Sequence, residues 1–281
     1  PEKNIPERNN AEGSQSMQQI EIVHPPKDNE PFLVINKPAG LPSAPLSPDD
    51  KKNAFSQSAT QFPQLLEVRS RKEIEHGLLH RLDTQTSGLL LIAATQECYA
   101  FLQEQQKNNL FQKTYTAKCA VLPENPEKLS GFPEKTAGMQ AFKTNPHQTI
   151  TLCSYFRNYA TGNKEVRPVT QTSGKAAQKK CRFDKKYETT VTVIKKKDDI
   201  LTAECSITAG YRHQVRCHLA WLGIPVINDR LYNFRTRTQP ECECSADVGT
   251  DVDFSGMQFF ATGLSFINPA TGERIYFSIE V

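Results

Sequence analysis

The sequence lacks any apolar run long enough to cross a membrane. Its longest small and apolar run is residues 88–94, whereas a membrane-spanning helix needs about 20 residues. Residues 1–18 contain no apolar stretch, so we expect no secretory signal. Their Pro, Asn, Glu and Ser content is typical of a disordered arm. These absences predict a cytoplasmic protein that does not associate with membranes.

Paired cysteines and metal-binding spacings are also missing. Six of the eight cysteines are isolated: Cys98, Cys119, Cys153, Cys181, Cys205 and Cys217. Cys242 and Cys244 form a Cys-x-Cys pair, but no second pair follows at the spacing that zinc requires. The positions of His80, His213 and His218 fit no common zinc pattern, and no glycine-rich phosphate loop is present. We therefore expect free thiols, no metal and no cofactor.

A strong charge of one sign is missing from the chain as a whole, but not from one segment. The formal net charge is only +3, from 34 Lys and Arg against 31 Asp and Glu. Residues 164–197 hold 11 Lys or Arg against three Asp or Glu. Such a segment attracts a polyanion, with Lys179, Lys180, Lys185 and Lys186 as candidate phosphate contacts. A solvated loop with lysines for solubility is the alternative interpretation.

The apolar patterning predicts more strands than helices. Expected strands lie at 32–36, 87–94, 111–122 and 150–156, followed by a hairpin over 187–210 and two strands within 257–281. A helix is expected near 60–72, following a polar loop at 46–58. A second is expected to begin after Thr95 as its N-cap, and a third over 212–223 with one apolar face. The fold class is therefore α+β, with a mixed, largely antiparallel sheet flanked by helices and loops.

The tetrad His80-Arg81-Leu82-Asp83 stands immediately before a strongly apolar strand. Turn-forming residues follow it, so the Asp83 carboxylate could simply cap that turn. The functional alternative is that Asp83 is a nucleophile or base held between cations.

Two further pairs of residues are candidates for anion or nucleobase binding. Arg212 and Arg216 are four residues apart at the start of a predicted helix, so we expect both on one helical face. Because a helix N-terminus is already electropositive, an anion such as Asp83 or a phosphate is expected opposite them, unless this face is merely solvated. On the strand after the first long helix, alternation places Lys113 and Tyr115 on one side, where they could bind a phosphate and a base or form plain surface.

Five blocks of the sequence together resemble one enzyme family. HRLDTQTSGLLLIA at 80–93 is similar to the signature of the RluA-type pseudouridine synthases, and AGYRHQVRCHLAWLGIPVINDRLY at 209–232 is similar to their second signature. NKPAGLP, KTYTA and GLSFINPATGE, starting at residues 36, 113 and 263, match three further blocks in the same order. The resemblance extends over residues 31–281.

This resemblance implies an RNA uridine isomerase with a cleft across its sheet. It implies that residues 19–281 form a stand-alone, monomeric catalytic domain, with a variable basic insert around 123–186. The substrate would be a flipped-out uridine of ribosomal or transfer RNA, isomerised without cofactor or metal. Asp83 would be the catalytic nucleophile, Arg216 its partner, and Tyr115 the ring that stacks on the base and assists proton removal from C5. Arg81 would fill the gap in the RNA stack, Val215 and Leu82 would line the pocket, and His80, Lys113 and Arg212 would bind RNA.

Three departures from the family pattern affect fine substrate contacts rather than these residues. Tyr211 replaces a small residue, Asn228 replaces a glycine, and Phe259-Phe260 replaces Leu-His. Residues 1–30 are too few for the small N-terminal RNA-binding module of many relatives, so we expect none. Two other functions remain open at this point. One is a catalytically silent RNA-binding or ribosome-assembly factor on the same fold, and the other is a hydrolase that uses Asp83 and a histidine.

Overall fold

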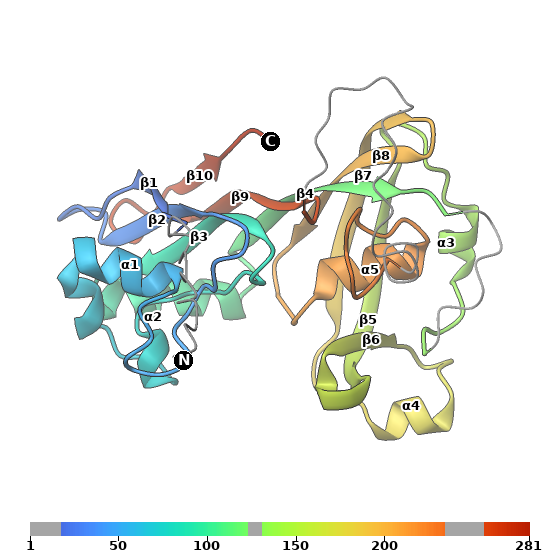
Figure 1. Cartoon of the computed structure of the whole chain (residues 1–281), viewed down its shortest axis with the longest axis horizontal. Coiled ribbons are helices and arrows are strands. Elements are labelled where there is room, and N and C mark those ends of the chain that lie inside the picture. The colour runs from blue at the N-terminus through green and yellow to red at the C-terminus, as the bar shows by residue number, and fades with distance from the viewer. Residues whose placement is uncertain (1–17, 123–130, 234–255) are drawn as a thin grey trace, which may run out of the picture.

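The computed structural model of this protein describes residues 18–122, 131–233 and 256–281. Within them, ten strands form one sheet in the order β1-β2-β3-β9-β4-β8-β7-β5-β6, with β10 paired to β9 (Figure 1). The strands are β1 Glu21–His24, β2 Phe32–Lys37, β3 Ser87–Ala93, β4 Gln112–Ala120, β5 Thr149–Tyr159, β6 Glu165–Val169, β7 Tyr187–Lys197, β8 Ile200–Ile207, β9 Phe259–Ile267 and β10 Arg274–Ser278. The helices are α1 Ala54–Gln61, α2 Gln96–Lys107, α3 Ala137–Ala141, α4 Lys175–Lys179 and α5 Gln214–Leu222, with short 3₁₀ turns η1 Pro63–Glu67, η2 Glu73–Glu75 and η3 Thr161–Asn163.

The sheet is mixed but largely antiparallel, as the sequence predicts. Among the described strands, β3 and β9 make the one parallel pair, and all other pairs are antiparallel. Strands β9 and β4 occupy the middle of the sheet in Figure 1. On one side of them lie β1 to β3 with α1 and α2, and on the other lie β5 to β8 with α3 to α5. The middle of the sheet therefore joins two lobes.

The predicted strands and the long helix are confirmed, and their local causes are visible. Strand β2 pairs with β3 over its whole length, and alternate side chains of the two strands enter the cores on opposite faces of the sheet. The Thr95 hydroxyl caps α2 by accepting from the amide of Cys98 at 3.3 Å. The β7–β8 hairpin turns at Asp198, which has a left-handed φ of 54°.

The helix expected near 60–72 is wrong in position. Helix α1 begins at Ala54, inside the stretch expected as polar loop, and ends at Gln61 before Pro63 starts a 3₁₀ turn. Asn53 explains the early start, because its side chain accepts from the amide of Ser56 at 2.8 Å. The sequence interpretation overlooked this asparagine as an N-cap.

A helix lies within 212–223 as predicted, but the expectation that it is amphipathic is wrong. Helix α5 begins at Gln214 and all nine of its residues are buried, including the polar ones. Its polar side chains are satisfied inside the protein. Gln214 donates to the Glu188 carbonyl, and the His218 ring contacts the hydroxyls of Ser154 and Thr189. Gly223 ends the helix in the left-handed conformation, as predicted.

Some sequence features fall outside or at the border of the described residues. The expected disordered arm, apart from its last residue, and the Cys242–Cys244 pair lie outside them. The remaining six cysteines are free. Within the described part of the chain, no helix has the length and apolar character needed to span a bilayer.

Candidate active site

The loop that presents Asp83 is fixed by its backbone. Asp83 and Thr86 form a tight turn, in which the Thr86 amide donates to the Asp83 carbonyl at 2.9 Å. Gly88 follows with a φ of 118°, and a Cβ added there would lie 2.2 Å from the carbonyl oxygen of Ala261 on β9. Glycine is therefore required where β3 meets β9, and this junction sets the direction of the loop.

Hydrogen bonds from Lys37 connect the segment that follows β2 to the loop that carries Asp83. Its ammonium group is fully buried and donates to the carbonyls of Pro38, Leu41 and Thr84 at 2.9, 2.7 and 3.2 Å. Burial lowers the pKa of Lys37 to about 8, and the nearby charge of Asp83 partly offsets that effect. In the sequence this lysine stands out only as part of the NKPAGLP block.

Asp83 is held by Arg216 at the start of α5. One Nη1–H of Arg216 donates to Asp83 Oδ2 at 2.6 Å, and the Asp83 side chain remains 28% exposed. The predicted contact between these two residues is therefore present. The alternative that the carboxylate caps its own turn is wrong, because the turn is closed by the backbone carbonyl of Asp83.

Asp229 is a second carboxylate on the same guanidinium, which the sequence analysis missed. Its two oxygens accept from Nε and Nη2 of Arg216 at 2.8 and 2.7 Å, and the residue is fully buried. Burial alone would lower the pKa of Arg216, but Asp229 and then Asp83 outweigh it and raise that pKa above its usual value. Asn228, where the family pattern has glycine, adopts a φ of 61° that asparagine tolerates. The departure therefore preserves the backbone that places Asp229.

His213 faces the other oxygen of Asp83. Its Nε2 lies 3.7 Å from Asp83 Oδ1, while its Nδ1 lies 3.1 Å from the hydroxyl of Tyr232. The Tyr232 oxygen already accepts from the Val166 amide, so its proton can point to Nδ1 and leave Nε2–H toward Asp83. Burial lowers the pKa of His213, with the charge of Asp83 acting against it, so we assign a neutral ring.

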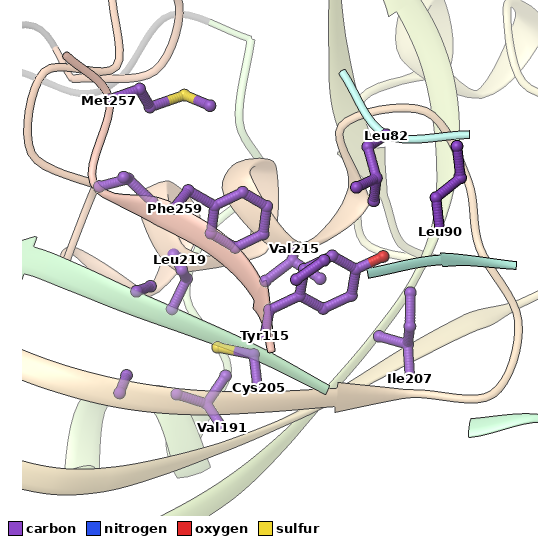
Figure 2. Close-up of a cluster of buried hydrophobic side chains, with 14 of the residues drawn as sticks. Leu82, Leu90, Tyr115, Val191, Cys205, Ile207, Val215, Leu219, Met257 and Phe259 are labelled. Atoms are coloured by element: carbon purple, nitrogen blue, oxygen red, sulfur yellow. The ribbon is translucent and has the colours of Figure 1, made fainter. Parts of the chain in front are cut away.

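Tyr115 lies in an apolar cluster beside Asp83. Figure 2 shows its ring between Phe259, Val215 and Leu82. The rings of Tyr115 and Phe259 are stacked, with centroids 5.0 Å apart and planes at 6°. The replacement of leucine by Phe259 thus adds an aromatic surface beneath the tyrosine. Burial, followed by the charge of Asp83, raises the pKa of Tyr115, so the phenol is protonated at neutral pH.

A cavity of about 760 Å³ is lined by Asp83, Tyr115, His213, Arg216 and Phe259. Its walls come from the Asp83 loop, α2, β4, the segment before β7 and the loop before α5, and they include Val215 and Leu82. Among the charged residues that line it, Asp83 is the one described carboxylate, and six are Lys or Arg: Arg81, Lys107, Lys113, Lys185, Arg212 and Arg216. The cavity therefore suits an anionic ligand with a planar group.

The remaining predicted residues divide between the cavity and the surface. Arg81 is exposed at the rim and pairs with Glu75 at 3.1 Å. His80 accepts from the Leu91 amide through Nε2, and burial, followed by Lys113, lowers its pKa well below the usual value. Lys113 and Tyr115 share one face as predicted, and both line the cavity.

Arg212 and the four lysines of the basic segment differ in their relation to the cavity. The left-handed φ of His213 breaks the backbone between the two arginines, so Arg212 and Arg216 do not share a helical face. Arg212 bonds instead to the carbonyl of Asn163 and the side chain of Asn158. Of the four lysines in the basic segment, Lys185 lines the cavity, whereas Lys179, Lys180 and Lys186 do not.

Comparison with known proteins gives the family. The model of the RNA pseudouridylate synthase family matches residues 31–221, so the chain belongs to that family. It is 26% identical to the dual-specificity RNA pseudouridine synthase RluA of Yersinia pestis, over 89% of this chain and 94% of the relative. It is 25% identical to the ribosomal large subunit pseudouridine synthase D of Neisseria meningitidis, over 93% of this chain and 58% of the relative. An uncharacterized pseudouridine synthase of Mycoplasma pneumoniae is 24% identical, and the match spans 65% of its length.

Solved structures agree on the fold. The human protein RNA pseudouridylate synthase domain containing 1 superposes with a TM-score of 0.58 at 18% identity, over 95% of this chain and 85% of that one. The human protein RNA pseudouridylate synthase domain containing 4 superposes with a TM-score of 0.56 at 17% identity, over 93% of this chain and 88% of that one. The fold is therefore that of the pseudouridylate synthases, as the sequence resemblance predicts.

Proposed function

We propose that this protein is an RNA pseudouridine synthase that isomerises uridine in ribosomal or transfer RNA. The observation that supports this most directly is the single cavity in which Asp83, Arg216 and Tyr115 meet. Relatives named for ribosomal and for transfer RNA both match the chain, including the tRNA pseudouridine(31) synthase of Saccharomyces cerevisiae at 26% identity. We propose a cytoplasmic monomer, with RNA as its partner and with neither cofactor nor metal.

In this proposal Asp83 attacks the flipped uridine or otherwise promotes cleavage of its glycosidic bond. Arg216 holds Oδ2, which leaves Oδ1 as the reacting oxygen. The freed base rotates and C5, instead of N1, rejoins the ribose, so no atom is gained or lost overall. Tyr115 stacks on the base in the apolar cluster, and Arg81 at the rim fills the gap in the RNA.

The protonation of Tyr115 limits its part in removing the C5 proton. A phenol whose pKa is raised by burial and by Asp83 is a poor base while that carboxylate is charged. When Asp83 forms a covalent bond to the substrate, the carboxylate loses its charge and the phenol becomes easier to deprotonate. Tyr115 would therefore act late in the reaction, after Asp83 has reacted.

Asp83→Asn tests the proposal directly. We expect folding and RNA affinity near those of the wild type and no pseudouridine, measured by tritium release from 5-tritiated RNA. Mapping of pseudouridine in cellular RNA with and without the gene would identify the target. Turnover retained in Asp83→Asn would refute the assigned mechanism.

The same assays separate the other two functions. A silent RNA-binding or assembly factor predicts an inactive wild type on total RNA. A hydrolase predicts free base or cleaved RNA, whereas isomerisation leaves the nucleotide mass unchanged.

We also propose phosphate contacts for the basic segment. Charge reversal of Lys179, Lys180, Lys185 and Lys186 should weaken RNA binding and flatten its dependence on salt. An unchanged salt slope would instead identify a solvated surface.

A further inference from the structure

The ammonium group of Lys113 has an unusual environment at the wall of the active-site cavity. Lys113 is 8% exposed, yet among the described residues its Nζ forms neither a hydrogen bond nor an ion pair. It lies 5.8 Å from the centroid of the Phe111 ring and against Gly210, where an added Cβ would be 3.0 Å from Nζ. Because Nζ faces the cavity and its charge has no partner there, the group is placed to receive an anion.

A second cation stands near it. Lys185 lines the same cavity, and its charge lowers the pKa of Lys113 further, after the larger effect of burial. Lys185 has no ion pair among the described residues, and its Nζ lies 5.8 Å from the centroid of the Tyr187 ring. Asp83 does not neutralise either lysine, because its carboxylate forms an ion pair with Arg216 and otherwise faces the neutral ring of His213.

We propose that Lys113 and Lys185 form a phosphate subsite, which binds a phosphate group of the uridine nucleotide that enters the cavity. This inference rests on the proposed function and specifies how its substrate is bound. Lys113 and Tyr115 are two residues apart on β4 and on the same face, about 7 Å along the strand. A nucleotide spans such a distance when its base stacks on Tyr115 and its phosphate reaches Lys113. The subsite thus recognises the nucleotide rather than the base alone.

Mononucleotides provide a test that needs neither turnover nor knowledge of the target RNA. The probes are uridine, uridine 5′-monophosphate, uridine 3′-monophosphate and inorganic phosphate, with binding measured by ligand-observed NMR at pH 7. For the wild type we expect at least one monophosphate to bind about tenfold or more tightly than uridine, as for a charge-assisted hydrogen bond. In Lys113→Met that preference should fall to near one, with uridine affinity unchanged.

The control is Lys107→Met. Lys107 also lines the cavity, but its ammonium already pairs with Glu104 at 3.0 Å, so its removal should leave the phosphate preference intact. Gly210→Ala gives a second perturbation that retains the charge. Its new methyl group would displace the Lys113 ammonium, and we expect a reduced preference in a protein that retains the lysine.

The pH dependence provides an independent measurement. Burial lowers the pKa of Lys113 to about 8, so the wild-type preference for the monophosphate should decline as the pH rises through 8 and the ammonium loses its proton. Lys113→Arg should keep its preference at pH 9, because arginine stays charged. The other titratable and charged groups that line the cavity are His80, Arg81, Asp83, Lys107, Tyr115, Lys185, Tyr187, Tyr211, Arg212, His213 and Arg216.

The outcomes separate the subsite from the proposed function. Equal affinity of the wild type for uridine and both monophosphates, or a preference that survives in Lys113→Met and Gly210→Ala, would overturn the subsite even if the protein makes pseudouridine. A preference that depends on Lys113 would support it even if tritium release failed.

Discussion

Replacing Asp229 by asparagine would test how the buried carboxylate positions the guanidinium that holds Asp83. The change keeps the size of the side chain but removes its charge, and Arg216 is then left with Asp83 as its only anionic partner among the described residues. Removing one member of a buried ion pair typically costs about 3–5 kcal/mol. Because Asp83 stays in place, we expect the lower end of that range. For a chain of this size it corresponds to a decrease in Tm of roughly 6–12 °C.

The same substitution should also slow the reaction. In Asp229→Asn the amide oxygen can accept from only one of Nε and Nη2 of Arg216, and the other nitrogen faces an amide N–H donor, so the hydrogen bond from Nη1 to Asp83 is less well directed. We expect kcat to decrease by about 10- to 100-fold, or roughly 1.4–2.7 kcal/mol in barrier, while RNA affinity changes little. Single-turnover tritium release and thermal unfolding would measure the two effects.

Glu165→Gln is the matched control. Glu165 and Arg167 on β6 form another buried ion pair, 2.6 Å apart, and neither lines the cavity. We expect this variant to lose stability but to keep its kcat at a temperature where it is folded. Equal loss of kcat in the two variants would refute a positioning role for Asp229, and wild-type stability of Asp229→Asn would refute the energetic argument.

Two further predictions concern stability. Gly88→Ala places a Cβ against the backbone of Ala261 at a positive φ, so we expect the free energy of unfolding in urea to fall by well above about 1 kcal/mol. Gly174→Ala, with open space around the added Cβ, should leave that free energy nearly unchanged. Burial lowers the pKa of His218 to about 3, below its unfolded value near 6.5. Unfolding therefore takes up a proton between these values, and stability should fall as the pH drops from 6.5 toward 3, by about 1.4 kcal/mol per pH unit at most for this site. Urea unfolding at pH 7 to 4 would check this, and a His218→Gln variant with the same slope as the wild type would contradict it.

The sequence was informative where local pattern and burial agree. The apolar run of β3 is buried on both faces, and the threonine before α2 caps it, so both elements could be predicted. The contact of Asp83 with Arg216 was predicted from the family resemblance, because the arginine pair alone also allowed a phosphate or a solvated face, and Arg212 does not share that face. The start of α1 was missed because its cap is an asparagine within a polar stretch.

Other parts of the site depend on tertiary structure that no local pattern reveals. The left-handed backbone of His213 separates the two arginines, and histidine gives no sequence signal for that conformation. Asp229 could have been found only from the Asn-Asp pair that follows Pro225 in the second signature block, since asparagine is suited to a positive φ before a buried acid. The isolation of the Lys113 ammonium arises from the packing of Phe111 and Gly210 around it.

The division of one guanidinium between two carboxylates has a consequence for reactivity. Arginine has five N–H donors. Asp229 accepts from Nε and from one N–H of Nη2, and the hydrogen bond to Asp83 comes from Nη1. A bidentate pair would fix both oxygens of Asp83 and make a poor nucleophile, because both lone-pair sets would be engaged. With one oxygen held and the other 3.7 Å from His213, the carboxylate is oriented but keeps Oδ1 for the substrate. The buried acid thus fixes the guanidinium whose Nη1 orients the reacting carboxylate, and this is why we expect its loss to affect kcat more than RNA binding.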